Sequence, residues 1–176
     1  MNATNVEIKA RCHNPGTIRQ ILEGRNARFI GEDRQIDTYY QVPRGRMKLR
    51  QGKIENALIY YDRHNQQGPK TSQIKLFKTS RGEDLRDLLS IALDELIVVD
   101  KKREIYFVDN VKFHIDQVQK LGSFVEIEAI DEDGSRSLEE LQHQCASFMK
   151  LFEIQDQDLI AESYSDLMLA QHHITL

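Results

Sequence analysis

NVEIKA, residues 5–10, and FVEIEA, residues 124–129, are two short segments in which charged and aliphatic side chains alternate in nearly the same order. In the first segment the polar side chains fall at every second position, Asn5, Glu7 and Lys9, and aliphatic side chains fill the positions between them. Successive side chains of a β-strand point to opposite sides, so this alternation predicts two strands. Each strand would have one apolar face and one charged face.

The rest of the chain predicts further strands and several helices. Alternation and turn residues indicate strands over residues 5–12, 28–40, 72–78, 97–108, 111–118 and 123–130, and two strands on either side of a turn near 52–56. Helical spacing and capping residues indicate helices over 15–24, 83–96, 137–152 and 158–169. The pattern is typical of an antiparallel sheet with helices packed against it.

Composition limits the class of protein. The 176 residues are 40% hydrophobic and 30% charged, enough for one core, and we expect a single domain over residues 1–176. A net charge of -4 argues against a general nucleic-acid binder. No apolar run reaches the roughly 18–20 residues that span a bilayer, which argues against a membrane protein. Two cysteines do not form a disulfide framework, and we expect a cytoplasmic location.

The polar faces of the predicted strands carry many charges. Cations fall two residues apart at Lys101 and Arg103, and again along the segment 44–50. Gly45 interrupts that segment, so we expect Lys48 and Arg50 to share one face and Arg44 to lie near its end. One interpretation is a half-buried sheet whose charged face contacts water. The other is a barrel with a polar lumen, which suits a polyanion bound together with metal ions.

Eight motifs occur in an order that resembles a known family. They are NVEIKA at 5–10, QIDTYY at 35–40, MKLRQG at 47–52, LIYYDR at 58–63, GPKTS at 68–72, VDKKREIY at 99–106, FHIDQVQKLGSFVEIE at 113–128 and SYSDLML at 163–169. Together they resemble the CYTH superfamily of triphosphate tunnel metalloenzymes, and within it the branch similar to class IV adenylyl cyclase. The resemblance spans nearly the whole chain.

The resemblance implies an α+β fold in which a closed antiparallel eight-stranded β-barrel forms a tunnel with a polar lumen, and helices pack on its outside. It implies an enzyme that binds a triphosphate with Mg²⁺ or Mn²⁺, first of all an adenylyl cyclase that converts ATP to cyclic AMP and pyrophosphate. The alternatives are an inorganic or thiamine triphosphatase and a non-catalytic triphosphate-binding module. The expected partner is a nucleoside or inorganic triphosphate, and exposed strand edges at a tunnel seam favour a homodimer.

The resemblance also implies roles for individual residues. The metal ligands would be Glu7, Asp116, Glu126 and Glu128. The phosphate-binding residues would be Lys9, Lys48, Arg50, Arg63, Lys101 and Arg103. Of these residues, Glu126, Lys101 and Arg103 would also be catalytic. Lys70 and Ser72 match a lysine and serine pair of the cyclase-like branch.

The chain departs from the family pattern in two places. Asn5 stands where the family has the first glutamate of Glu-x-Glu-x-Lys, so the metal site has one charge fewer and depends more on the remaining glutamates. This departure motivates the hypothesis of a binding module without turnover. Gln73 and Ile74 stand where the cyclase-like branch has an acidic residue and a tyrosine, which loosens the assignment of the substrate.

Overall fold

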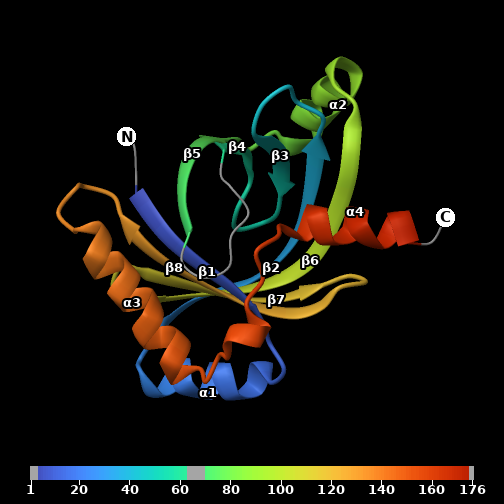
Figure 1. Ribbon diagram of the computed structural model, residues 1–176. Coiled ribbons are helices and arrows are strands. Elements are labelled where there is room, and N and C mark those ends of the chain that lie inside the picture. Colours follow the sequence, from blue (N-terminus) through green and yellow to red (C-terminus); the bar gives the residue numbers. More distant parts are fainter. Residues whose placement is uncertain (1–3, 63–69, 175–176) are drawn as a thin grey trace.

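Eight antiparallel strands form one strongly curled sheet (Figure 1). The computed structural model describes residues 4–62 and 70–174, except the side chains of 70–73 and 172–174. The strands are β1 (Thr4–Arg11), β2 (Arg28–Tyr40), β3 (Arg46–Gln51), β4 (Ala57–Asp62), β5 (Lys70–Lys78), β6 (Glu95–Val108), β7 (Val111–Val118) and β8 (Gly122–Asp131). The predicted α+β class and antiparallel strands are confirmed.

The strands pair in the order β1-β5-β4-β3-β2-β6-β7-β8. β8 pairs in turn with β1 along the whole of β1, from Thr4 opposite Asp131 to Arg11 opposite Phe124. The contact between β1 and β5 is shorter and consists of three residue pairs, from Asn5 opposite Ser72 to Glu7 opposite Lys70. A fully closed tunnel therefore stays a prediction at this seam. The register also brings the two segments with which the sequence analysis began side by side, because Lys9 lies opposite Glu126.

Helices pack against the sheet, three of them on its apolar outer face and the last one against the apolar end of its inner face. They are α1 (Pro15–Gly24), α2 (Gly82–Ala92), α3 (Leu138–Leu151) and α4 (Tyr164–Ile174), with a short 3₁₀ turn η1 (Asp156–Asp158) before α4. The expected caps are present, since the side chains of Asn14 and Ser137 accept hydrogen bonds from the first turns of α1 and α3. Figure 1 shows α1 and α3 below β1, β7 and β8. The described residues contain no helix long and apolar enough to cross a membrane.

The largest hydrophobic core lies between α1, α3 and the sheet. Val6, Ile8 and Ala10 of β1 are buried there against Leu22 of α1 and Leu141 of α3. These are the aliphatic positions of the alternating segment, so the predicted apolar face of β1 is confirmed. The opposite face of the same strands points to the inside of the curl and carries the charges.

Two predicted helices differ from the structure. α2 ends at Ala92 rather than at residue 96, because Glu95 already belongs to β6 and pairs with Tyr40 of β2. Leu89 of this helix is buried, whereas Leu88 is 63% and Ile91 is 89% exposed. The helix predicted over residues 158–169 begins only at Tyr164, after the turn η1.

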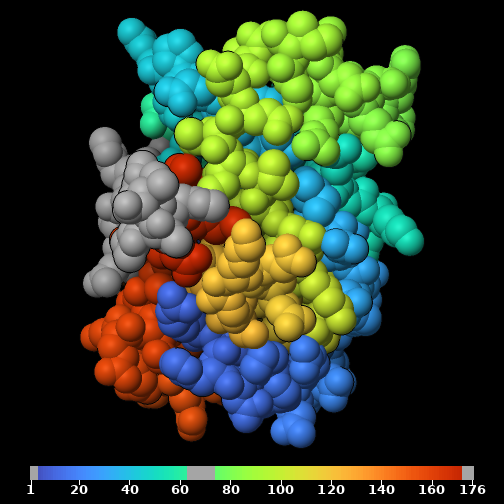
Figure 2. All heavy atoms as spheres, turned by 90° about the vertical axis from the view of Figure 1, so that its right-hand side faces the viewer, coloured from blue at the N-terminus to red at the C-terminus, as the bar shows by residue number. Residues whose placement is uncertain are grey.

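In the view turned by 90°, the turn between β7 and β8 lies between α1 below and α2 above (Figure 2).

The inner face of the sheet is apolar at one end. Tyr39, Val99, Val118 and Phe124 lie on the same strand faces as the inner charges and form a buried cluster with Tyr164 of α4. Phe124 and Tyr164 contact each other with ring centroids 4.9 Å apart. This cluster fills one end of the interior, so the polar residues occupy the remaining part.

Candidate functional site

A cavity of about 870 Å³ lies inside the curl of the sheet. Its lining includes seven of the residues selected from the sequence: Glu7, Lys9, Lys48, Arg50, Arg103, Glu126 and Glu128. They come together because each occupies an inward position of its strand, and neighbouring strands pair in a register that aligns those positions. Gly45 has a positive φ of 63° just before β3, and Lys48 and Arg50 follow it on the inner face as expected.

The other selected residues lie elsewhere. Lys101 and Asp116 are each 1% exposed and lie behind the lining of the cavity. Arg63 and the side chains of Lys70 and Ser72 are outside the described residues. The metal-binding, phosphate-binding and catalytic roles implied for the selected residues stay predictions, for those in the lining and for those outside it.

Glu126 is the centre of the network on the β8 side of the cavity. Its Oε2 accepts a hydrogen bond from Arg103 Nη2 at 2.8 Å, and its Oε1 lies 3.5 Å from Lys9 Nζ. Burial alone would raise the pKa of this carboxyl, but Arg103 and Lys9 hold it well below its usual range. Glu126 is therefore ionised at neutral pH and can only accept hydrogen bonds.

His114 contacts the same carboxylate, with its Nδ1 3.0 Å from Glu126 Oε2. Burial and the charge of Arg103 lower the pKa of His114 to about 4, so the imidazole is neutral at pH 7. Because Glu126 only accepts, the proton of this neutral ring is on Nδ1. Nε2 is then a buried acceptor, and it has no partner among the described residues.

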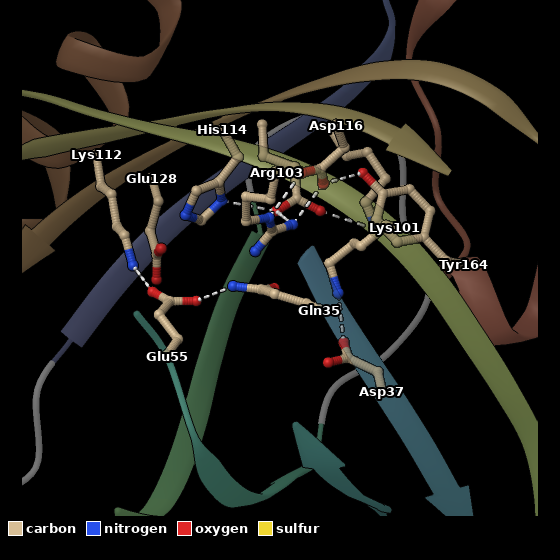
Figure 3. Close-up of polar contacts among 12 residues, drawn as sticks. Gln35, Asp37, Glu55, Lys101, Arg103, Lys112, His114, Asp116, Glu128 and Tyr164 are labelled. Atoms are coloured by element: carbon tan, nitrogen blue, oxygen red, sulfur yellow. Dashed lines mark hydrogen bonds and ion pairs between the residues drawn. The ribbon is translucent and has the colours of Figure 1, made fainter. Parts of the chain in front are cut away.

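Arg103 is held from its other side by Asp116. The Asp116 carboxylate accepts from Arg103 Nε at 2.6 Å and from Nη2 at 2.5 Å, and Tyr164 donates its hydroxyl to it at 2.7 Å. Figure 3 shows the Asp116 carboxylate between Arg103 and the Tyr164 hydroxyl. Asp116 and Tyr164 thus fix the guanidinium with one edge toward Glu126 and the cavity.

A second network surrounds Asp37 on β2, a residue that the sequence analysis did not select. Asp37 is 1% exposed and its carboxylate accepts from Lys48 at 2.9 Å, from Arg50 at 2.9 Å and from Lys101 at 2.7 Å. Although burial alone would raise the pKa of Asp37, the three cations hold it well below its usual range. Burial in turn lowers the pKa of Lys101 to about 7. One buried carboxylate thus orients three cations predicted to bind phosphate.

Glu7 and Glu128 are opposite each other on β1 and β8 and form the most acidic part of the lining. Burial and the nearby carboxylate of Glu7 raise the pKa of Glu128. Asn5 donates from Nδ2 to Glu128 Oε1 at 2.5 Å, and its Oδ1 is buried without a partner among the described residues. Two carboxylates and one unpaired amide oxygen are hard donors of the kind that Mg²⁺ and Mn²⁺ bind.

No group of three His, Cys, Asp or Glu side chains in the described residues has the geometry of a complete metal site. Mg²⁺ is commonly held by one or two carboxylates, with phosphate oxygens and water as its other ligands. Glu7, Glu128 and the Asn5 amide fit that kind of incomplete site.

Sequence reasoning missed further charged residues of the cavity. Glu55, in the turn between β3 and β4, contacts Arg50 and Lys112, and Gln35 of β2 donates to it at 2.9 Å (Figure 3). Gln35 and Asp37 share a face with Tyr39, so strand parity could have selected them. Glu55 lies in a turn, where no period in the sequence indicates the direction of a side chain.

Comparison with protein families gives one match, the model for the CYTH domain, over residues 3–164. A search of the curated proteins found no match to this chain.

Several solved structures share the fold. The PH1012 protein of Pyrococcus horikoshii OT3 is 24% identical, with a TM-score of 0.80, and the match covers 93% of this chain and 98% of that one. A candidate adenylate cyclase from Vibrio parahaemolyticus is 17% identical, with a TM-score of 0.78 and coverage of 96% and 99%. A Hippeastrum protein, a candidate adenylyl cyclase reported to have a dominant triphosphatase activity, is 13% identical, with a TM-score of 0.64 and coverage of 96% for both chains.

Proposed function

The chain belongs to the CYTH domain family, and on this premise we propose that it is a metal-dependent enzyme that acts on a triphosphate bound inside a tunnel. The observation that supports this proposal is the cavity, in which cations and carboxylates from six strands and one turn face the same space. Clustered Lys and Arg side chains bind phosphate oxygens, and carboxylates bind the divalent cation that accompanies a triphosphate.

The charges of the cavity support a requirement for metal. Each cation described above has a carboxylate partner: Lys9 and Arg103 contact Glu126, Lys48 and Arg50 contact Asp37, and Lys112 contacts Glu55. A triphosphate adds several negative charges to a site that is already balanced. In the proposal, Glu7, Glu126 and Glu128 hold Mg²⁺ or Mn²⁺, helped by the amide oxygen of Asn5. The bound cation would neutralise charge on the phosphate oxygens during bond breaking.

The first candidate reaction is the cyclisation of ATP. The ribose 3'-hydroxyl oxygen attacks the α-phosphorus, and the bond to the departing pyrophosphate breaks in line with it. In the proposal, Lys9, Arg50 and Arg103 position the phosphates. Lys101 is assigned the same phosphate-binding role. Ile59, Ile74 and Leu76 line the cavity beside these charges and offer an apolar surface to an organic group such as a base.

The second candidate is a triphosphatase, in which water attacks the terminal phosphorus. The likeness to the Hippeastrum protein with dominant triphosphatase activity favours it. The neutral His114 adds a structural reason, since its unpaired Nε2 could accept a hydrogen bond from a water molecule in the polar part of the cavity. Both reactions would use the same phosphate-binding residues.

A substrate panel tests the proposal. We would incubate the purified protein with ATP, tripolyphosphate or thiamine triphosphate, each with Mg²⁺ or Mn²⁺, and identify the products. Cyclic AMP with pyrophosphate would support the cyclase, and phosphate release without cyclic AMP would reject it in favour of the triphosphatase. Tight metal-dependent binding with no product after long incubation would indicate the binding module that Asn5 suggested.

Ligand binding should stabilise the protein against heat. Glu7 and Glu128, two half-buried carboxylates opposite each other, oppose folding until a cation lies between them. A ligand at a hundredfold excess over its dissociation constant stabilises the folded state by about 2.7 kcal/mol. We therefore expect tripolyphosphate with Mg²⁺ to raise the melting temperature more than either component alone. Equal melting curves in all conditions would contradict a metal and triphosphate site.

The substitution Asn5→Glu should strengthen metal binding. Asn5 is 5% exposed and contacts Glu128, so a glutamate there would add a third carboxylate beside Glu7 and Glu128. A higher ligand charge raises the affinity of a hard divalent cation. We expect half-maximal activity at a lower Mg²⁺ concentration, with a similar or higher maximal rate. An activity titrated with Mg²⁺ that shows no change in the half-maximal concentration would argue against Asn5 as part of the metal site.

A further inference from the structure

Glu55 projects a carboxylate among the cations of the cavity from the turn between β3 and β4. Its Oε2 accepts from Arg50 Nη1 at 2.8 Å and from Gln35 Nε2 at 2.9 Å, and its Oε1 accepts from Lys112 Nζ. Its side chain is 22% exposed, so it lies at the open part of the cavity rather than in the sealed interior. Glu55 and Lys112 have no role in the assignments made from the sequence.

The turn is built to keep Glu55 in this position. The buried carboxylate of Asp33 accepts from the backbone N–H of Lys53 at 2.7 Å and from that of Glu55 at 3.0 Å. Gly52 is required there, since a Cβ atom at this position would collide with the Asp33 carboxylate and with the backbone oxygen of Glu55. The side chain of Glu55 is thus directed inward by its backbone.

Glu55 has the charge and contacts that a phosphate group would have at the same place. Although burial alone would raise its pKa, Arg50 and Lys112 hold the pKa of Glu55 well below its usual range, so it is ionised at neutral pH. A carboxylate and a phosphate oxygen use the same guanidinium and ammonium donors. The Glu55 carboxylate and a phosphate group cannot both make full hydrogen bonds to Arg50 and Lys112, and their like charges repel each other.

We propose that Glu55 is an internal anion that occupies the phosphate subsite formed by Arg50 and Lys112, and that a phosphate group of the substrate displaces it. This inference rests on the proposed function, because it requires a triphosphate to bind these cations. Glu55 keeps the two cations oriented and neutralised in the free protein. A single phosphate would have to displace Glu55 with the contacts of this subsite alone. A polyphosphate also contacts the other cations of the cavity, so the presence of Glu55 favours a polyphosphate over a single phosphate.

The test compares wild type with Glu55→Gln, which removes the charge at nearly constant volume. The ligand is a tripolyphosphate analogue with methylene bridges, which cannot be cleaved, titrated in the presence of Mg²⁺ by calorimetry. We expect Glu55→Gln to bind it about tenfold more tightly, because the competing charge is gone. Glu132→Gln is the matched control, since Glu132 lines the same cavity but contacts neither Arg50 nor Lys112 among the described contacts. Its affinity should stay within about twofold of wild type.

Melting curves separate displacement from a purely structural role. Without ligand, Glu55→Gln should melt at a lower temperature than wild type, because Arg50 and Lys112 lose an ionised partner. The analogue should then raise its melting temperature by more than it raises that of wild type. Equal or weaker binding by Glu55→Gln, while wild type binds, overturns the inference and leaves the proposed function intact.

If neither protein binds the analogue, the proposed function fails and the inference fails with it. Glu55→Ala is a second variant, with the same expected direction. Unfolding of both variants would contradict the inference, because a group that the substrate displaces is not required by the fold.

Discussion

Glu126→Gln should lower the turnover of the triphosphate substrate by at least about a hundredfold, the largest effect on activity that we expect from a single substitution. Glu126 contacts Arg103, Lys9 and His114 and is assigned to the metal. A glutamine removes the anion to which all three of these groups are oriented, and its amide N–H groups would face the two cations. Loss of one electrostatic group that acts in the transition state commonly costs two to three orders of magnitude in rate.

The control for this variant is Glu104→Gln. Glu104 is also a strand glutamate with an arginine partner, but its partner is Arg19 of α1 on the outer side of the sheet, at 2.6 Å. We expect its rate to stay within about twofold of wild type. Circular dichroism should first show that both variants are folded. A folded Glu126→Gln with a normal rate and a normal metal requirement would refute the assignment of Glu126.

Asp37→Asn should cause the largest loss of stability, about 3–5 kcal/mol in the free energy of unfolding. Three cations, Lys48, Arg50 and Lys101, contact this one buried carboxylate. An asparagine leaves their positive charges close together without an anion. Removing one partner of a buried ion pair costs much more stability than the intact pair contributes, because the other charge stays buried and unpaired. Urea denaturation measures the difference, and a loss below about 1 kcal/mol would contradict this account.

Asp100→Asn is the matched control, because Asp100 pairs with Arg34, whose side chain is 74% exposed. Exposed pairs contribute about 0–1 kcal/mol, so this variant should unfold nearly as wild type does. The effect at Asp37 should also depend on pH. Its folded pKa lies below the ordinary value of 3.8, so its contribution is complete above that value and is lost as the pH falls below it. The difference between wild type and Asp37→Asn should therefore narrow in acid.

The sequence by itself determined the strands and the side of each strand that carries charge. The alternation in residues 5–10 places Glu7 and Lys9 on one face and Val6 and Ile8 on the other, and the structure confirms both faces. The caps at Asn14 and Ser137 likewise depend on residues three positions apart. Such features could be predicted because they depend on neighbours along the chain.

Only the tertiary structure decided which charged side chains contact each other and how these contacts shift their pKa values. Asp37 could be placed on an inner face from its parity, but its role depends on cations of β3 and β6 that the strand pairing brings to it. Glu55 has no periodic signal, and the Asp33 carboxylate directs it inward through backbone hydrogen bonds. α2 ends before residue 96 because the residues from Glu95 onward belong to β6 and pair with β2, although their apolar spacing continues that of the helix. Periodicity is local to one element, whereas ion pairs depend on register between elements, and the register is fixed only when the whole sheet forms.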